Sequence, residues 1–471
     1  MLARARSRPT DLWAALAWVV VGSIAFMLGR SSAEQPLLAV SIIVALGIGW
    51  LIVARRLTVL VPLATLALAW GMSTLPLVSL AFPVKFAMLA AIAATIVPWL
   101  VSRERHLPVS VPFIVAFGVL VLFATMSIGW SVDPSESWPK AISLALLGTA
   151  ALVAVPLNCR DEQDARAILR WSGVTAAAFT VAGVAAGLAE AATAFDANAR
   201  FLGLLSNPNA LGFWIAPILP ALVIMSTQEP AGGRRNTLIA STLALAAALA
   251  LTGSRGGTIA SVAGVAIAFL ASGFGGQGRT KRRILVVGIV ALAAAAFIFP
   301  ALGVTPRSQT SGHGEGFFEL GSGSGRTVVW SEAIPLINAA PLRGHGFGTT
   351  PDLFPEIQQQ FGATVLGRTH NSYLEAAVDL GWPGLVILVG LVSSGMITAW
   401  RVAHRPGPHS AFATVLLAGI VGGAVEGVFE SGVLAAGSLI ALPFWIVVAF
   451  AHSLGTAVRR EAQITASYMH S

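Results

Sequence analysis

Histidine and arginine side chains stand beside expected helix starts in the second half of the chain. His370 and Asn371 precede the run Ser372-Tyr373-Leu374-Glu375, whose Ser-x-x-Glu form is that of a helix capping box. A helix N-terminus presents backbone N–H groups and the positive end of the helix dipole. We expect this position to keep His370 neutral, as a general base must be. The structural alternative is a histidine that only orders the turn.

Two further segments place an arginine next to a turn or a helix start. Arg200 is followed by Asn207-Pro208-Asn209, which has the form of an N-cap and a proline at the first helical position. Arg255 lies in a glycine-rich turn at 252–257 between two expected spans. Arginine pairs bidentately with phosphate oxygens, and each charge-assisted bond contributes about 1.5–3 kcal/mol. Together with Arg368, just before the histidine, these arginines predict a diphosphate site beside a base.

Other basic residues of this region are secondary candidates for binding the same substrate. They are Arg326, Arg343 and His345, the last of them in the glycine run 344–348. Arg343 could equally anchor a membrane span or pair with an acidic loop residue, and His345 could be a turn residue. The glycine run follows no expected strand, so it does not predict a nucleotide site.

Several catalytic motifs are absent from the sequence. There is no Asp-x-Asp pair, no metal-ligand spacing of cysteine and histidine, and no Gly-x-Ser-x-Gly elbow. The single cysteine, Cys159, excludes an intramolecular disulfide. We therefore expect a reaction without a metal or other cofactor, in which arginines neutralise a phosphate leaving group.

The elements that must position these residues are membrane spans. The chain is 56% hydrophobic and 11% charged, whereas soluble domains carry about 25% charged residues. Apolar runs of the roughly 20 residues needed to cross a bilayer recur along it. The sequence predicts an all-α polytopic membrane protein of about 12–14 spans. Fourteen are expected, near 12–30, 36–54, 58–80, 83–101, 110–130, 139–156, 168–190, 209–226, 236–253, 256–272, 284–301, 383–400, 411–428 and 437–455.

The distribution of basic residues predicts the orientation of the bundle. With a cytoplasmic N-terminus, every inner segment carries at least two arginine or lysine residues, which is the positive-inside pattern. Both termini are then cytoplasmic, and the net charge of +8 reflects membrane insertion rather than nucleic-acid binding. Nine basic residues remain on the outer face: Arg30, Lys85, Lys140, Arg200, Arg255, Arg307, Arg326, Arg343 and Arg368.

The spans divide the chain into three expected parts. Residues 1–301 hold the first eleven spans, 302–382 form a long extracytoplasmic loop with the catalytic segment, and 383–471 hold the last three spans and a cytoplasmic tail. Short helices are expected in the loop at 326–339 and 352–361. The run Gly381-Trp382-Pro383-Gly384 predicts a helix break, with 372–380 at the membrane surface before it.

These residues together resemble the O-antigen ligase/O-antigen polymerase superfamily of bacterial envelope glycosyltransferases. The resemblance runs from about Arg200 to Gly384. It rests on four pieces in order: TGSRG at 252–256, GR…W at 325–330, PL…GHGFG at 341–348 and HN…YLE at 370–375. Each piece alone is weak, but their order before the last spans is specific. The first 190 residues match only as generic spans.

The resemblance implies a metal-independent, inverting transferase of the bacterial inner membrane whose donor is an undecaprenyl-diphosphate-linked glycan. Arg200 and Arg255 would bind the diphosphate, and His370 would activate an acceptor hydroxyl on the periplasmic side. Arg326, Arg343, Arg368, His345 and Asn371 would bind substrate. The superfamily holds ligases, which transfer to lipid A-core of lipopolysaccharide or to protein, and polymerases, which join repeat units of O-antigen or exopolysaccharide; both remain open.

The alternative function is a flippase for lipid-linked oligosaccharide or another transporter. Transporters place ionisable residues or broken helices near the bilayer midplane. Such residues are nearly missing from the span centres here, and polar residues gather towards one face instead. The pattern therefore favours an enzyme.

Overall fold

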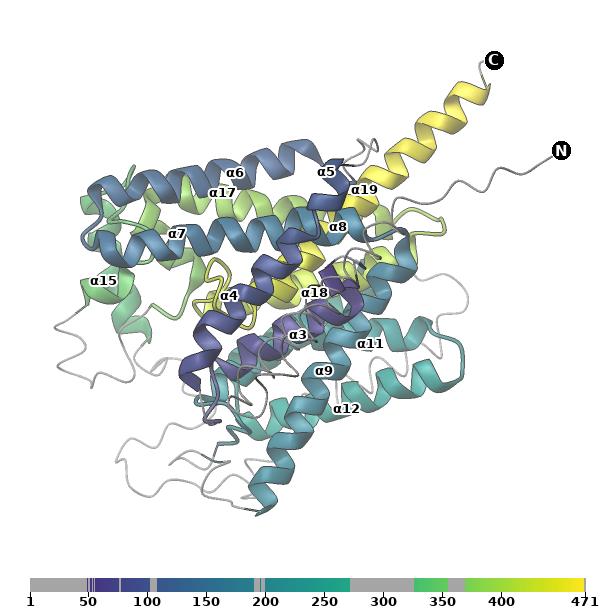
Figure 1. Ribbon diagram of the computed structural model, residues 1–471, viewed down its shortest axis with the longest axis horizontal. Coiled ribbons are helices and arrows are strands. Elements are labelled where there is room, and N and C mark those ends of the chain that lie inside the picture. Colours follow the sequence, from purple (N-terminus) through teal and green to yellow (C-terminus); the bar gives the residue numbers. More distant parts are fainter. Residues whose placement is uncertain are drawn as a thin grey trace, which may run out of the picture.

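The computed structural model of the protein is a bundle of α-helices (Figure 1). The structure describes residues 56–75, 78–101, 108–189, 200–271, 326–354 and 369–469, and the single positions 49, 51, 52, 54 and 195. Within this part of the chain the only β-type pairings are two isolated bridges, Ser73 with Leu205 and Phe195 with Phe201. The predicted all-α fold class is confirmed.

Among the described residues, eleven helices form the body of the bundle: α3 (Leu57–Trp70), α4 (Val78–Ala94), α6 (Val111–Met126), α7 (Pro134–Gly148), α9 (Glu162–Ala189), α11 (Pro208–Gln228), α12 (Gly233–Thr252), α13 (Arg255–Ala271), α17 (Ser372–Ala403), α18 (Ser410–Phe429) and α19 (Ala441–Met469). Shorter elements are α5 (Val97–Val101), η1 (Ser127–Trp130), η2 (Thr149–Ala154), α8 (Val155–Asn158), α15 (Arg326–Ala339) and η4 (Thr350–Leu353). In the described part, eight helical segments are long and apolar enough to cross a bilayer, and α3, α4 and α13 are shorter apolar helices. These lengths and compositions are those of a multi-pass membrane protein.

Eleven of the fourteen expected spans coincide with helices of the structure. The expected spans 12–30 and 284–301, and nearly all of 36–54, lie outside the described residues. The boundary between the expected spans 58–80 and 83–101 was predicted wrongly. Helix α3 already ends at Trp70, and α4 begins at Val78, so that Pro83 lies inside α4 rather than at its start. Of the short helix expected at 352–361, the described residues contain only the end of the 3-10 turn η4.

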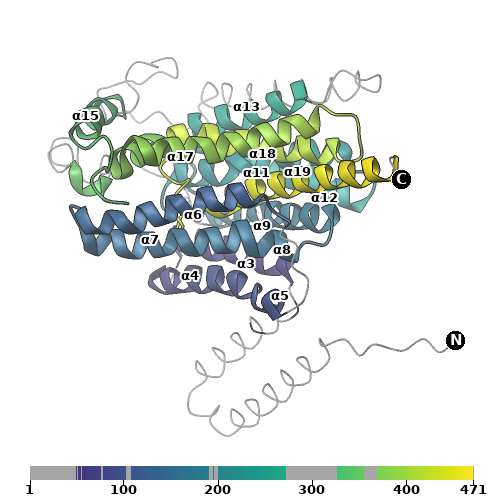
Figure 2. The same cartoon turned by 90° about the horizontal axis from the view of Figure 1, so that it is seen from above.

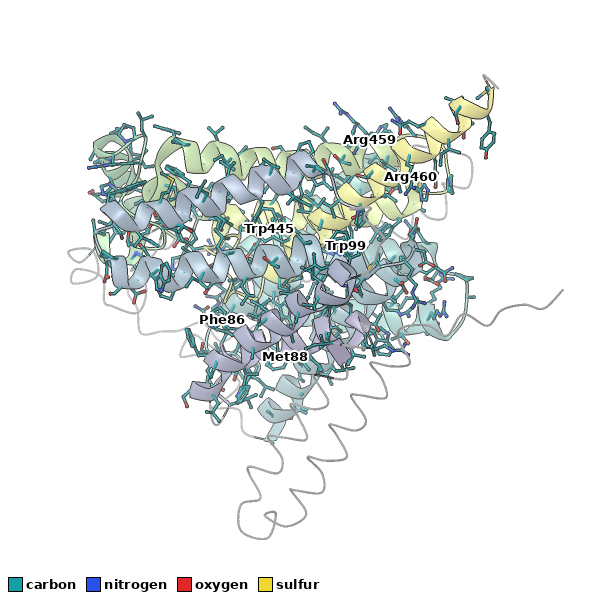
Figure 3. All side chains as sticks on the ribbon, turned by 45° about the horizontal axis from the view of Figure 1, so that its top comes forward. Phe86, Met88, Trp99, Trp445, Arg459 and Arg460 are labelled. Carbon is teal, nitrogen blue, oxygen red and sulfur yellow. The ribbon has the colours of Figure 1, made fainter. Side chains whose placement is uncertain are left out.

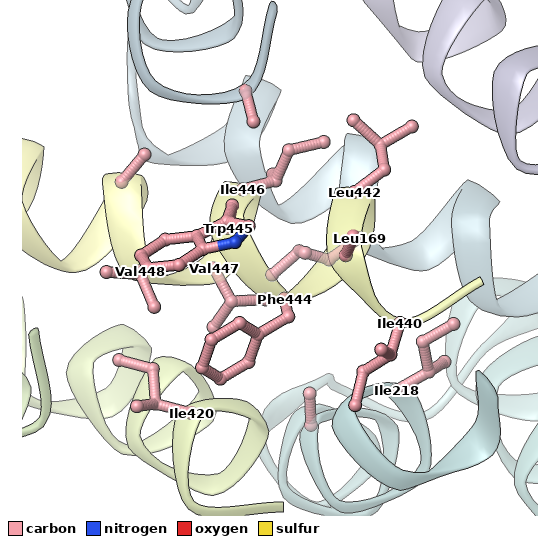
Figure 4. Packing of buried hydrophobic residues seen from close by; sticks show 14 of the residues in the cluster. Leu169, Ile218, Ile420, Ile440, Leu442, Phe444, Trp445, Ile446, Val447 and Val448 are labelled. Atoms are coloured by element: carbon pink, nitrogen blue, oxygen red, sulfur yellow. The ribbon is translucent and has the colours of Figure 1, made fainter. Parts of the chain in front are cut away.

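Helix α18 lies at the centre of the bundle, next to α11, α13, α17 and α19 (Figure 2). Glycines bring the backbones together: a Cβ at Gly422 would collide with the carbonyl oxygen of Ala216 in α11, and one at Gly264 would collide with that of Ala418. Small residues allow such close contact between membrane helices, where lipid offers no hydrophobic driving force. Phe444 and Trp445 of α19 are fully buried in the core, and Phe444 lies against Gly423 of α18 (Figure 4).

Loops from distant parts of the sequence meet at the end of the bundle that carries α15, which we call the α15 end (Figure 1). The backbone N–H of Thr74 donates to Leu204 O at 3.0 Å, and that of Val132 donates to His345 O at 2.9 Å. Arg459 and Arg460 of the C-terminal helix lie at the opposite end (Figure 3). The C-terminal helix therefore ends at the end of the bundle opposite α15.

The expected break in the helix after Leu380 is confirmed as a kink. Gly381 has φ 66° and ψ −171° inside α17, and a Cβ there would lie 2.5 Å from Pro341 O. The helix resumes immediately and continues to Ala403. The segment before the kink is covered by α15, since Ala377 and Val378 are buried in a small apolar cluster with Val329 and other residues of that helix.

The glycine contacts of α18 lead to the first testable prediction. Gly422→Ala should destabilise the bundle by about 1–3 kcal/mol, because the added methyl group must push α18 away from α11. The matched control is Gly390→Ala in α17, where a Cβ meets nothing within 4 Å. Thermal unfolding of both variants in detergent provides the measurement. Equal melting temperatures for the two variants would contradict the close contact.

Candidate functional site

His370 pairs with a carboxylate that follows α18. Its Nδ1 lies 2.9 Å from Glu430 Oε2, and the residue Glu430 is only 8% exposed. An ionised carboxylate only accepts hydrogen bonds, so Nδ1 donates and Nε2 of the neutral imidazole keeps its lone pair. A carboxylate on Nδ1 fixes the tautomer and the ring orientation, and it stabilises positive charge when Nε2 takes up a proton. A histidine oriented by a carboxylate in this way can act as a general base.

The backbone of His370 is held in an unusual conformation. Its φ is 46°, and it is the only residue other than glycine with a positive φ in the described part of the chain. Such a conformation costs about 1–3 kcal/mol and persists where neighbouring contacts impose it. Here Trp330 Nε1 donates to Thr369 O at 2.8 Å, and the N–H of Asn371 donates to Ser431 Oγ at 3.2 Å. Contacts on both sides therefore fix the direction of the imidazole.

The start of α17 was predicted correctly, but the capping residue was not. Asn371 is the N-cap, and its Oδ1 accepts hydrogen bonds from the N–H groups of Tyr373 and Leu374, both at 3.0 Å. Ser372 is instead the first helical residue. Its Oγ donates to Glu430 O at 2.7 Å and accepts from the N–H of Gly432 at 3.0 Å. The serine is thus engaged by the loop between α18 and α19, and the capping-box assignment was wrong by one residue.

Arg200 bridges two helix ends at the α15 end. Its Nε donates to Thr252 O at 2.9 Å, and its Nη2 donates to Asn209 Oδ1 at 2.7 Å. Asn207 is the N-cap of α11 and Pro208 its first residue, as expected. The guanidinium therefore fixes the beginning of α11 relative to the turn between α12 and α13.

Arg255 is the first residue of α13, and the turn that precedes it contains Gly253 in a left-handed conformation with φ 61°. The next residue, Gly256, lies against α18: a Cβ there would be 3.1 Å from Glu426 Oε2 and 2.8 Å from Phe429 Cβ. Arg255 therefore begins a helix that contacts the last turn of α18, one residue before Glu430.

A continuous series of contacts consequently joins the three residues expected to carry the chemistry. Arg200 bonds to the end of α12, Arg255 begins α13 three residues later, α13 packs on the last turn of α18, and Glu430 holds His370. Because Trp330 of α15 bonds to Thr369, next to His370, this series of contacts lies at the α15 end. The structure thus brings the backbone positions of these three residues to one region of the molecule.

The secondary candidates for substrate binding differ in where they lie and in what they contact. His345 Nε2 lies 2.9 Å from Leu336 O in α15, and Arg343 is exposed while its carbonyl accepts a hydrogen bond from Trp130 Nε1 at 3.0 Å. Arg326 is the first residue of α15, and nothing is described of its side chain. Arg368 lies outside the described residues.

The glycine run 344–348 attaches the loop to the bundle. Gly344, Gly346 and Gly348 all have positive φ. The buried Asp379 carboxylate accepts hydrogen bonds from the N–H of Gly348 at 2.7 Å, and Lys140 Nζ donates to Gly348 O at 2.6 Å. The run is therefore a tight connection between α7 and α17, which accounts for its glycines without a nucleotide.

Sequence reasoning missed the acidic partners of the site. Glu426 and Glu430 are both buried, and they lie four residues apart at the end of an apolar span. Carboxylates at such positions in a membrane helix are costly and therefore point to a function. This was a readable signal, although nothing in the sequence indicated that Glu430 would meet a histidine 60 residues away.

Comparison with known families agrees with this geometry. Residues 240–389 match a family model described as O-antigen ligase. This segment of the chain is therefore similar to an O-antigen ligase domain. The matched residues include Arg255, His345 and His370, whereas Arg200 and Glu430 lie outside them. The comparison with curated proteins finds no match. The resemblance to the O-antigen ligase/polymerase superfamily is thereby confirmed.

The Arg200 bridge leads to a prediction on stability. In a double-mutant cycle of Arg200→Lys and Asn209→Ala, we expect a coupling free energy of about 1 kcal/mol or more, because lysine cannot bond to both helix ends. Thermal unfolding of the purified variants measures it. A coupling near zero would mean that the guanidinium does not bridge α11 and α12.

Proposed function

We propose that this membrane protein is a glycosyltransferase of the O-antigen ligase/polymerase type. It transfers a glycan from undecaprenyl diphosphate to an acceptor hydroxyl by a metal-independent, inverting mechanism. The observation that carries the proposal is the His370–Glu430 hydrogen bond at the end of the bundle where Arg200 and Arg255 also lie. A base held by a buried carboxylate next to guanidinium groups suits the transfer of a sugar away from a diphosphate.

In this mechanism His370 Nε2 removes the proton of the acceptor hydroxyl. The hydroxyl oxygen forms a bond to the anomeric carbon as the bond from that carbon to the diphosphate oxygen breaks, with inversion of configuration. The proton remains on the imidazole, and the negative charge leaves with the diphosphate. Glu430 stabilises the imidazolium and holds the ring in place, which raises the rate of proton removal.

Arg255 and Arg200 stabilise the departing diphosphate. Guanidinium groups fixed before the reaction stabilise developing charge without reorganising, which is the most effective electrostatic contribution to catalysis. Arg200 is already oriented by two hydrogen bonds, and Arg255 begins a helix whose N-terminal N–H groups also favour an anion. Arg326, Arg343, Arg368, His345 and Asn371 would bind the rest of the substrate.

The proposed setting is the bacterial inner membrane, with both termini in the cytoplasm and the α15 end facing the periplasm. The support is the positive-inside pattern of the sequence, together with the position of Arg459 and Arg460 at the end opposite α15 (Figure 3). A polyprenyl chain would then lie in the outer leaflet while its diphosphate reaches the arginines.

Ligase and polymerase activities can be separated by a single assay. Purified protein is incubated with undecaprenyl-diphosphate-linked repeat units, first alone and then with lipid A-core as the added acceptor. Growth of a ladder without added acceptor identifies a polymerase, whereas transfer only to lipid A-core identifies a ligase. Movement of the lipid-linked glycan across vesicles without any transfer would contradict the enzyme and favour a flippase.

The base assignment leads to a prediction on activity. His370→Ala should abolish transfer, and Glu430→Gln should lower its rate by about 10²-fold or more, because the imidazolium loses its carboxylate. The rate of transfer of radiolabelled glycan from the lipid carrier measures both. Full activity in the histidine variant would overturn the assignment.

A second histidine supplies a matched control. His409 at the opposite end of the bundle also contacts carboxylates, with 3.2 Å from Nδ1 to Glu162 Oε2 and 3.2 Å from Nε2 to Glu461 Oε1. Partial burial lowers the pKa of His409, but its hydrogen bonds to Glu162 and Glu461 outweigh this effect and raise the pKa. Because His409 lies far from the candidate site, His409→Ala should leave the rate of transfer unchanged.

The role of Arg255 gives a further prediction. Arg255→Lys should lower the rate by about 10–100-fold, because lysine keeps the charge but cannot form two parallel bonds to a phosphate. Steady-state kinetics with varied lipid-linked donor provide the measurement. An unchanged kcat/KM would exclude a bidentate contact in the transition state.

A further inference from the structure

Lys85 of α4 reaches the α15 end without a role in the mechanism above. Its side chain passes the end of α3, where a Cβ at Gly71 would lie 3.5 Å from Lys85 Cδ. Its ammonium lies beside the loop between α18 and α19, where a Cβ at Gly437 would lie 2.9 Å from Nζ. The charge is therefore brought to the loop that begins with Glu430.

The surroundings of this ammonium are aromatic. Lys85 Nζ lies 4.9 Å from the ring centroid of Phe82 and 5.3 Å from that of Phe86, and the two rings pack edge to face at 5.1 Å. Phe82 is 60% exposed, and Figure 3 labels Phe86 on the same helix. The faces of the rings attract the cation electrostatically. They do not replace the oxygen acceptors that the three N–H groups of an ammonium require.

Lys140, at the same end of the bundle, has oxygen partners for its ammonium group. Its Nζ lies 2.8 Å from Glu136 Oε2 and donates to Gly348 O at 2.6 Å. For Lys85, by contrast, no oxygen in the described part of the chain accepts a hydrogen bond from Nζ, and no carboxylate there pairs with it. A partly buried ammonium held in this way is ready to donate to an oxyanion.

Lys85 is also connected to both sides of the candidate site. The residues after Gly71 pair with the segment that follows Arg200: the N–H of Ser206 donates to Met72 O at 2.9 Å, and the N–H of Thr74 donates to Leu204 O at 3.0 Å. On its other side is the loop that starts at Glu430. The stem of Lys85 thus passes the end of α3, whose following residues pair with 204–206, and its ammonium lies at the loop that starts at Glu430.

We propose that Lys85, framed by Phe82 and Phe86, is a further binding residue for the lipid-linked donor and takes a phosphate oxygen of its polyprenyl diphosphate. The proposal rests on the proposed function, since it assigns a third cation to the same substrate. The exposed Phe82 ring then packs on the apolar carrier next to the phosphate. The pairing combines an ionic and an apolar contact at the boundary between bilayer and water, as an anionic lipid requires.

Binding of undecaprenyl diphosphate to the detergent-solubilised full chain tests the proposal. Lys85→Met, which keeps the length of the side chain and removes its charge, should raise the Kd about tenfold. Lys85→Arg should restore binding to within about threefold, and the matched control Lys140→Gln should leave the Kd unchanged. An unchanged Kd in Lys85→Met, with an unchanged melting temperature, overturns the proposal.

Inorganic pyrophosphate distinguishes the two sources of the anion. If pyrophosphate also binds more weakly to Lys85→Met, the residue recognises the oxyanion alone; if only the lipid does, it recognises the headgroup at the membrane. If Lys85→Met binds both pyrophosphate and the lipid as tightly as wild type does, the proposed site is overturned. Should Lys85→Met unfold, Phe82→Leu replaces it, because that ring is exposed: weaker binding of the lipid supports the site, and unchanged binding overturns it.

The outcomes for this residue and for the proposed enzyme are separable. If the wild-type protein transfers glycan and Lys85→Met binds the lipid as tightly as wild type, the inference on Lys85 fails alone. If no transfer occurs with any acceptor while Lys85→Met still weakens binding, the transferase fails and the lipid site remains.

Discussion

The close contact of α18 with α11 and α13 is the constraint on which the rest of the structure depends. Glycines at the crossings allow backbone to meet backbone, as at Gly422 with Ala216 O. Because α18 is fixed in this way, its last turn meets the first turn of α13, and Glu430 emerges beside the start of α17. Membrane helices lack a hydrophobic driving force for association, so this steric fit decides the geometry.

Polar groups at the α15 end are held by many short connections rather than by one loop. The His370 segment bonds to α15 through Trp330 and to the loop after α18 through Asn371 and Ser372. A strained backbone at His370 is compatible with this, since several neighbours impose it.

Much of this arrangement could be predicted from local sequence. Apolar runs predicted the described helices, Asn207-Pro208 predicted the start of α11, and Gly381 predicted the kink of α17. The partners of these elements could not be predicted, because contacts such as that of Glu430 with the histidine join residues far apart in the chain. Asn371 rather than Ser372 caps α17 for the same reason: the serine is taken by the loop after α18.

The central claim is that one end of the bundle holds a lipid diphosphate between arginines and a histidine base. A cryo-EM structure of the protein with undecaprenyl-diphosphate-linked glycan tests this most directly. The account predicts phosphate density within hydrogen-bond distance of the guanidinium groups of Arg200 and Arg255, with the first sugar facing His370 Nε2. Density for the diphosphate at another surface, away from these three side chains, would contradict it.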